Sequence, residues 1–509
     1  MLVPSIGAGF LYFLKKKSGS ALIRGDRHKT GRREGCSLTF LTEWLMTPSP
    51  LALKLDKEKG ARRMKKKDTF FVGLMLFSMF FGAGNLIFPP FLGMGAGTSF
   101  WPAMTGFIIT AVGLPLIVLL AVGLVKDGAN TLGSRVHPLF GMIFTIVVYL
   151  SIGPLMAIPR NANVAFEMGF KPFLGSATVS QTMLLLVFSA IFFILVYLLS
   201  LNPSKVVDYM GRWITPALLI SIVVLCITGF LKLDEPLKAP TETYQTASLF
   251  KGFIDGYSTM DALAALAFGI VIITALKQKG ITNKKQLTAY TLKTGIIAGA
   301  ALALVYIGIG LLGAKMASYG TFDNGTAVLS SASTILMGTG GKILLGVIFT
   351  LACFTTCVGL TIACGQYFSK IAPKLSYRVV VTLVTLVSFS LANLGLNQIL
   401  KVSVPFLVMA YPLTIVLVTL AFLHRFFKGS QKVYAGAMLL TGIVSLYDGL
   451  KMFGLKWSLL ESLMGNLPLA SVGLGWVVPA IAGGLVGFVL EKVSRSSSSS
   501  EEFKLTKAS

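Results

Sequence analysis

An acidic residue stands inside one of the most apolar stretches of the sequence. Asp261 belongs to the run "FKGFIDGYSTMDALAALAFGIVIITAL", which is long enough to cross a bilayer. An ionisable side chain in hydrocarbon is costly, and it usually faces an aqueous pathway or a partner. We therefore predict a coupling or gating role for Asp261. The alternative is a structural role, in which Asp261 caps the second half of an interrupted helix.

The stretch "FFGAGNLIFPPF", from Phe80 to Phe91, breaks a second apolar run. Glycines weaken a helix through backbone entropy, and prolines lack the N–H donor. In hydrocarbon an unpaired backbone group costs several kcal/mol, so a break survives only where protein, water or a ligand satisfies it. Gly82 to Asn85 therefore predict a cavity, although glycines can also serve tight packing. We expect Pro89 and Pro90 to end the span at the outer surface.

The run around Asp261 is itself interrupted, because Gly256, Ser258 and Thr259 precede the acid in what would be membrane. Two broken helices at corresponding positions of two halves indicate an inverted-repeat transporter, with substrate and ion sites between the half-helices. Free helix N-termini there would favour a carboxylate, and exposed carbonyls would favour a cation.

Hydroxyl side chains gather in a third apolar run, "TLACFTTCVGLTIAC". Thr355 and Thr356 lie among small residues, and their oxygens could help to bind a small cation such as Na⁺. Threonine in a membrane helix often bonds only to its own backbone, which is the alternative. The three cysteines of this run have no histidine nearby, so we expect close helix packing there and no metal cluster.

The composition places these residues in an integral membrane protein. Of 509 residues, 54% are hydrophobic and 13% charged, and the mean hydropathy is +0.78. The alternation typical of transmembrane β-strands is absent. The net charge of +25 lies outside the apolar runs, so we attribute it to cytoplasmic connectors facing anionic lipid and expect no nucleic-acid binding.

The apolar runs predict an all-α membrane protein with about twelve spans. Lysine and arginine recur in alternate connectors, so the positive-inside rule puts both termini in the cytoplasm. The expected spans are 69–91, 101–125, 139–158, 181–201, 213–231, 251–276, 289–313, 341–369, 377–393, 402–422, 432–453 and 472–490.

The sequence divides into three predicted segments. Residues 1–63 are expected to be a disordered extension or an over-extended reading frame, since "MKKKDTFFVG" at Met64 would make a natural start. Residues 64–492 form the transporter domain, and the serine-rich residues 493–509 are expected to be a disordered tail. Within the domain, repeat one covers about 69–231, repeat two about 251–422, and accessory helices about 432–490.

The two interrupted runs also carry a family resemblance. "MKKKDTFFVGLMLFSMFFGAGNLIFPPFLG" and "GYSTMDALAALAFG" resemble the branched-chain amino acid:cation symporters of bacteria, the BrnQ or LIVCS type. The resemblance extends from Met64 to about Lys492. It implies uptake of leucine, isoleucine and valine across the cytoplasmic membrane, driven by Na⁺ or H⁺, without a cofactor or an obligate protein partner. More remotely, the family is similar to the LeuT-like fold with five-plus-five inverted repeats.

The resemblance also implies roles for particular residues. The break at Gly82 to Asn85 would hold the substrate carboxylate, with Asn85 helping to bind sodium, and Thr355 and Thr356 would supply hydroxyls for a second sodium. An apolar pocket must receive the branched side chain. Its walls could include Tyr257, Met260 and Phe81, although ordinary lipid or core contacts are the alternative for each. The full set expected to bind substrate is Phe81, Gly82, Ala83, Gly84, Asn85, Tyr257, Ser258, Thr259 and Met260.

Three other classes of membrane protein compete with a symporter. A channel would give flux that does not saturate, and an exporter would move a hydrophobic compound without gradient-driven amino acid uptake. An enzyme such as a proton-pumping subunit would need several intramembrane carboxylates, lysines or histidines, whereas His137 and His424 lie in connectors. No Gly-x-x-x-x-Gly-Lys loop is present, which argues against ATP as the energy source.

Overall fold

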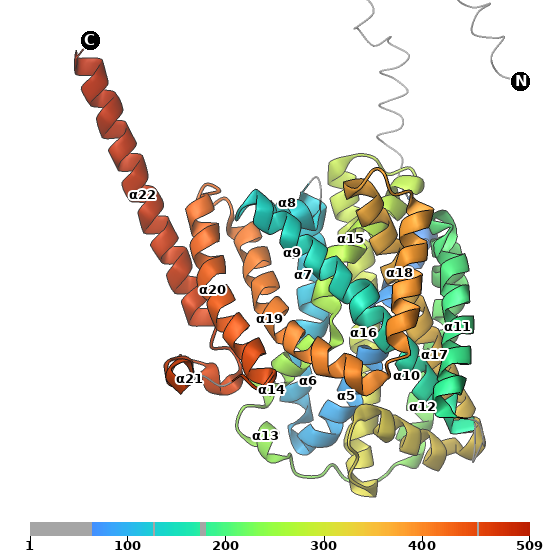
Figure 1. Cartoon of the computed structure of the whole chain (residues 1–509). Helices are drawn as coiled ribbons and strands as arrows, with labels where there is room; N and C mark the ends of the chain where they lie inside the picture. Colours follow the sequence, from blue (N-terminus) through green and yellow to red (C-terminus); the bar gives the residue numbers. More distant parts are fainter. Residues whose placement is uncertain (1–63, 126–127, 174–179, 456–457, 509) are drawn as a thin grey trace, which may run out of the picture. The chain divides into compact units, whose positions relative to one another are not determined.

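The structure is a computed structural model that describes residues 64–125, 128–173, 180–455 and 458–508. Contacts divide the chain into Met1–Glu58 and Lys59–Ser509, and every described residue belongs to the second unit. The predicted extension of residues 1–63 lies outside the described residues. Helices dominate the described part (Figure 1).

The first half of the helical domain begins with a broken helix. Helix α4 ends at Phe80, two residues follow, and α5 begins at Ala83. The helices of this half are α4 (Lys66–Phe80), α5 (Ala83–Ala96), α6 (Phe100–Ile108), α7 (Leu114–Leu124), α8 (Ala129–Ser134), α9 (Pro138–Leu150), α10 (Ala157–Gly169), α11 (Gln181–Ser200) and α12 (Thr215–Lys232).

The second half repeats the broken start. Helix α14 ends at Asp255, a 3₁₀ turn follows over Gly256–Thr259, and α15 begins at Asp261. The helices here are α13 (Glu242–Gln245), α14 (Ser248–Asp255), α15 (Asp261–Gln278), α16 (Lys284–Met316), α17 (Gly325–Ile371), α18 (Tyr377–Ala392) and α19 (Leu396–Leu423). Both breaks that the sequence predicts are therefore present as interruptions of the helix.

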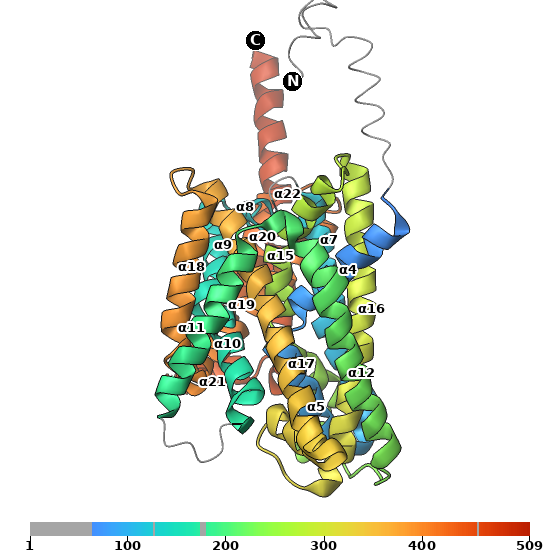
Figure 2. The ribbon, with the colours of Figure 1, turned by 90° about the vertical axis from the view of Figure 1, so that its right-hand side faces the viewer.

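The half-helices are held by backbone contacts that only glycine permits. A Cβ on Gly93 of α5 would lie 1.9 Å from the Gly310 carbonyl oxygen of α16, and one on Gly252 of α14 would lie 1.9 Å from the Ala103 carbonyl oxygen of α6. Such close approach is the usual way in which membrane helices pack. Figure 2 shows α4 and α5 lying among α12, α16 and α17.

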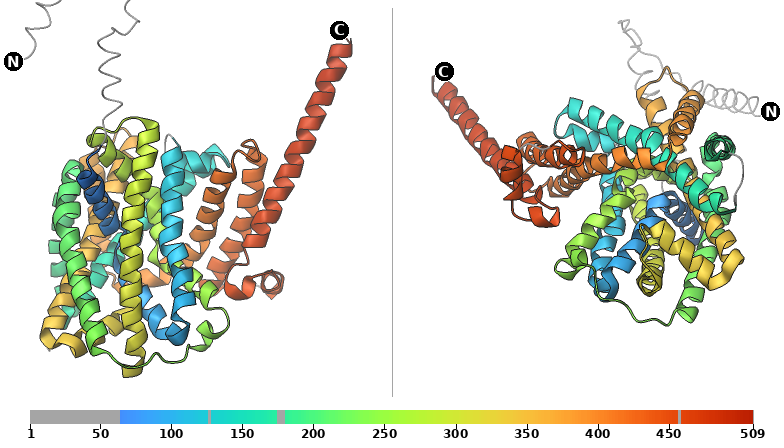
Figure 3. Two further views of the ribbon diagram at one scale, coloured as in Figure 1. Left: turned by 180° about the vertical axis from the view of Figure 1, so that it is seen from behind. Right: turned by 60° about the horizontal axis from the view of Figure 1, so that its bottom comes forward.

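Three further helices follow: α20 (Gln431–Met452), α21 (Ser458–Gly465) and α22 (Val477–Ala508). Helix α20 packs against α19 and α22, and Figure 3 shows α20 and α22 at the edge of the bundle, away from α4. Among the described helical runs, ten are long and apolar enough to cross a membrane.

Several sequence-based boundaries are wrong. Pro89 and Pro90 do not end the first span, because α5 continues through them to Ala96; neighbouring helices can satisfy the groups that a proline frees. The third span does not end at residue 158 but continues to Gly169, after a break over Ser151–Leu155. Helix α22 also continues to Ala508, where a disordered tail is expected. A helix that has already nucleated extends at little cost, which accounts for this continuation.

Candidate functional site

The break between α4 and α5 is closed by two asparagine side chains. The Gly82 amide donates to Asn85 Oδ1 at 3.2 Å, and the Ala83 amide donates to Asn161 Oδ1 at 2.8 Å. A Cβ on Gly82 would lie 2.8 Å from both Asn161 Oδ1 and Thr356 Oγ1. Glycine is therefore required where α10 and α17 approach the break.

The break between α14 and α15 turns through a left-handed residue. Met260 has φ 68° and ψ 7°, a conformation that costs a non-glycine residue about 1–3 kcal/mol and is enriched at functional sites. The Asp261 amide donates to Thr259 Oγ1 at 3.4 Å. Thr259, rather than Asp261, therefore supplies the side-chain oxygen at the start of α15.

The two breaks meet through a buried hydrogen-bonded cluster of Asn85, Asp261 and Tyr306. Asn85 Nδ2 donates to Asp261 Oδ2 at 2.6 Å, and the Tyr306 hydroxyl donates to the same oxygen at 3.1 Å. Asn85 Nδ2 also contacts the Tyr306 hydroxyl. The three residues are 1%, 2% and 0% exposed. Neutral donors from α5 and α16 thus hold the Asp261 carboxylate, which also lies at the favourable N-terminal end of α15.

Helix α10 contributes two polar residues that the sequence analysis missed. It follows the break at Gly153 and Pro154, and it carries Arg160 and Asn161, which are 4% and 2% exposed. The predicted span ended at residue 158, so these side chains were assigned to a connector. The motif Gly-Pro inside an apolar run, followed by "PRNAN", was the signal that could have revealed them.

The two predicted threonine ligands lie on α17 beside the end of α4. Thr355 Oγ1 is 2.8 Å from the Ser78 carbonyl oxygen, and Thr356 Oγ1 is 3.5 Å from the same oxygen. Thr355 Oγ1 also lies 3.0 Å from the carbonyl oxygens of Leu351 and Ala352. The hydroxyls therefore meet carbonyls both of their own helix and of α4, and the donor set consists of oxygens, which hard cations prefer.

A cavity of about 20 Å³ lies between the breaks, with room for about one water molecule. Three of the predicted substrate-binding residues do not line this cavity: Phe81, Tyr257 and Ser258. Phe81 stacks on Phe77 with ring centroids 5.1 Å apart, and Tyr257 stacks on Tyr411 at 4.6 Å. The predicted residues that line the cavity are Gly82, Ala83, Gly84, Asn85, Thr259, Met260, Asp261 and Thr356.

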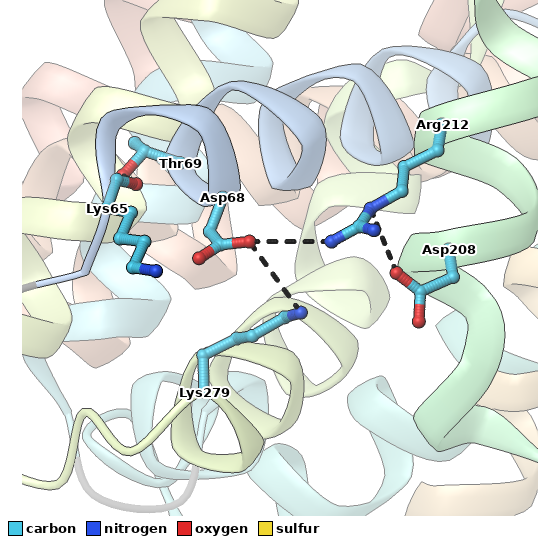
Figure 4. A network of polar contacts seen from close by, with 6 residues as sticks. All are labelled: Lys65, Asp68, Thr69, Asp208, Arg212 and Lys279. Atoms are coloured by element: carbon cyan, nitrogen blue, oxygen red, sulfur yellow. Dashed lines mark hydrogen bonds and ion pairs between the residues drawn. The ribbon is translucent and has the colours of Figure 1, made fainter.

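A looser polar network ties the start of α4 to its neighbours (Figure 4). Asp68 Oδ1 is 3.6 Å from Arg212 Nη2 and 4.0 Å from Lys279 Nζ, and Arg212 Nε is 3.0 Å from Asp208 Oδ1. Arg212 also lies over the Phe71 ring, 5.2 Å from its centroid. The network connects the first turn of α4 to the segment before α12 and to the end of α15.

The opposite half-helix, α14, has a polar contact at its junction with the break. Asp255 accepts a hydrogen bond from the Tyr244 hydroxyl and pairs with Lys251. Burial, together with the neighbouring Asp255 carboxylate, raises the pKa of Tyr244 in the connecting segment. Tyr244 therefore stays a neutral donor to Asp255 at physiological pH.

Comparison with known proteins extends across most of the chain. The profile of the family described as "Branched-chain amino acid transport protein" matches residues 65–494. The chain is 46% identical to the branched-chain amino acid permease BraB of Bacillus subtilis (strain 168), over 83% of this chain and 95% of the relative. It is 38% identical to the permease BrnQ of Escherichia coli (strain K12), over 82% and 94% of the two chains.

A solved structure shares the arrangement of helices. The nucleobase-cation-symport-1 family transporter Mhp1, in a closed conformation with bromovinylhydantoin bound, superposes with a TM-score of 0.52 at 14% identity, over 84% of this chain and 93% of Mhp1. At this identity the likeness concerns the fold alone. It supports the expected all-α, LeuT-like architecture.

Proposed function

The chain belongs to the branched-chain amino acid transport protein family, and we propose that it imports leucine, isoleucine and valine together with a cation. Its relatives are named permeases and carriers, so the chain is a transporter and not an enzyme. One observation carries the proposed mechanism: both helix breaks border the same buried cavity and are joined there by the contact between Asn85 and Asp261.

The substrate is a zwitterion with an apolar side chain, and the cavity offers a counterpart for each part. The N-terminal end of α5 suits a carboxylate, and the Asp261 carboxylate suits an ammonium group. Ile152, Ala264 and Leu360 supply apolar walls. Because a cavity of about 20 Å³ is too small for leucine, α4, α5, α14 and α15 must move apart to admit it. This requirement fits transport by alternating access.

The coupling ion in this proposal is sodium, bound as a second substrate by Thr355 and Thr356. Their hydroxyls and the Ser78 carbonyl bring three oxygens together where α17 meets the end of α4. Sodium would thereby link α17 to the half-helix that must move. A proton carried by Asp261 is the second candidate, favoured by the burial of that carboxylate at 2% exposure.

The transporter in this proposal is a multi-pass protein of the bacterial cytoplasmic membrane, with both termini in the cytoplasm. The lysines and arginines of alternate connectors support that orientation. The proposal includes no obligate protein partner and no nucleic acid.

Uptake into sealed liposomes tests the proposal. Purified protein is reconstituted, and labelled leucine is followed under an inward sodium gradient, an inward proton gradient, both, or neither. We expect saturable accumulation above equilibrium under the sodium gradient. Accumulation under the proton gradient alone would transfer the coupling role to Asp261, and leucine that only equilibrates would refute symport.

A further inference from the structure

Arg160 is a buried cation without a direct hydrogen-bond or ion-pair partner among the described residues. It lies on α10 with 4% of its surface exposed, and its Nε is buried without a hydrogen-bond acceptor. Within the described ranges, the guanidinium makes no direct ion pair, and the Asp261 carboxylate acts on it only through electrostatic attraction across the cavity. An unpaired charge inside a protein costs several kcal/mol, and arginine is among the costliest residues at the centre of a membrane. A negative group that arrives with a ligand would offset this cost.

The guanidinium lies where such a group would meet a second set of donors. Arg160 Nη2 is 3.1 Å from the position that a Cβ on Gly84 would occupy, beside the first turn of α5. The first amides of a helix have no partner within the helix. Here the amides of Gly82 and Ala83 donate to asparagine side chains. Among the described residues, no side chain accepts a hydrogen bond from the amides of Gly84 and Asn85.

The same cavity holds one charge of each sign without pairing the two. Arg160 and Asp261 both line it, but Asp261 accepts its hydrogen bonds from Asn85 and Tyr306. A guanidinium and a carboxyl group that line one cavity without a direct ion pair match the two ends of an amino acid. A metal ion would add positive charge beside Arg160, and a neutral solute would bring no anionic group to it.

We propose that Arg160 binds the α-carboxylate of the transported amino acid, together with the free amides at the start of α5. The planar guanidinium can donate two parallel hydrogen bonds to a carboxylate, a geometry that lysine cannot reproduce. The absence of a side chain at Gly84 lets the first turn of α5 lie close to the guanidinium. The inference rests on the proposed function, since it assigns a role within the same substrate site.

Leucinamide tests this assignment, because it differs from leucine in having a neutral amide where leucine has its carboxylate. Binding of each ligand is measured by the thermal stabilisation of purified protein in detergent at saturating sodium. For wild-type protein we expect leucine to bind far more tightly than leucinamide. Arg160→Gln should weaken leucine binding by about 10- to 100-fold, as expected for loss of hydrogen bonds to a charged group, and should leave the affinity for leucinamide unchanged.

Two further variants complete the test. Arg160→Lys keeps the positive charge but loses the two parallel donors of the guanidinium, so it should weaken leucine binding less than Arg160→Gln does. If Arg160→Gln does not fold, the affinities of Arg160→Lys for leucine and leucinamide provide the test. Arg378→Gln, at an exposed position on α18, should leave both affinities unchanged. An unaltered ratio of leucine to leucinamide affinity in the folded Arg160 variants would overturn the assignment. Wild-type protein that binds neither ligand would instead refute the proposed function.

Discussion

The two ends of α4 are joined to the rest of the protein by polar contacts of very different kinds. At the break beyond its C-terminal end, Asn85 and Asp261 form a 2.6 Å hydrogen bond and are 1% and 2% exposed. At its start, Asp68 and Arg212 are 3.6 Å apart, and their side chains are 26% and 42% exposed. Buried hydrogen bonds to a charge are strong and costly to break, whereas exposed ion pairs contribute only about 0–1 kcal/mol.

The contrast between the buried cluster at the break and the exposed network at the start of α4 fits the proposed alternating-access mechanism. The cluster of Asn85, Asp261 and Tyr306 joins the two breaks, and its side chains are buried and hydrogen-bonded to one another. The proposed movement of α4 would require its start to shift, and a weak, solvent-screened network suits such a shift. We therefore expect the buried cluster to determine whether transport occurs, and the Asp68 network to adjust only the balance between conformations.

Removal of the Asn85 side-chain amide from the buried cluster should have the largest effect on leucine uptake. Asn85→Ala deletes the cap on the Gly82 amide and a donor to Asp261, leaving a buried carboxylate with one donor fewer. We expect coupled leucine uptake to fall by at least about 100-fold, in line with about 3 kcal/mol for such a loss. Uptake into liposomes, normalised to inserted protein, measures it.

A matched asparagine outside the cavity serves as the control. Asn393 donates to Ser189 Oγ and to the Phe389 carbonyl, far along the sequence from either break. Asn393→Ala should retain most of the uptake. Wild-type uptake by Asn85→Ala would show that the buried cluster is not the site.

Loss of a threonine hydroxyl should have an intermediate effect on sodium. Thr355→Val and Thr356→Val each remove one oxygen near the Ser78 carbonyl while keeping the shape of the side chain. We expect the sodium concentration for half-maximal uptake to rise by about tenfold or more in each variant, since a contact to a charge is worth about 1.5–3 kcal/mol. Sodium titrations of leucine uptake provide the measurement.

Thr361 on the same helix is the control for these variants. It is fully buried, and among the residues that the structure describes its hydroxyl has no hydrogen-bond partner. Thr361→Val should leave the sodium dependence unchanged. Equal sodium dependence in Thr355→Val, Thr356→Val and Thr361→Val would remove the proposed ion site from α17.

The smallest effect is expected at the start of α4. Asp68→Asn removes the charge that faces Arg212 and Lys279, which should change the balance between conformations by at most about 1 kcal/mol, or about fivefold. The change in the leucine KM should shrink as the ionic strength rises, because salt screens exposed charges. If Asp68→Asn lost as much transport as Asn85→Ala, the proposed difference between the two ends of α4 would be wrong.

Both helix breaks could be predicted from the sequence because their signals are local. The glycines and polar residues concentrated at 82–85 and 256–261 together weaken a continuous membrane helix, and this can be recognised without knowing the other helices. The same two segments carry the family resemblance, and the expected LeuT-like fold rests on that resemblance. The prediction that Pro89 and Pro90 end the span was wrong because the signal is not local. Contacts with other helices determine whether a helix continues past a proline.

The partners across the cavity could not be predicted in the same way. Tyr306 looks like any aromatic residue of an apolar span, and only the approach of α16 to α5 makes it a donor to Asp261. Arg160 was placed outside a span because its helix resumes after the break at Pro154. Phe81, which is predicted to bind substrate, does not line the cavity, because its ring stacks on Phe77.

Equilibrium binding of labelled leucine to the purified protein, titrated with sodium at constant pH and ionic strength, tests most directly whether ion and amino acid bind together at the two breaks. The account predicts that leucine affinity rises with sodium by about tenfold or more, and then saturates. Leucine affinity that stays the same from zero to saturating sodium would contradict it.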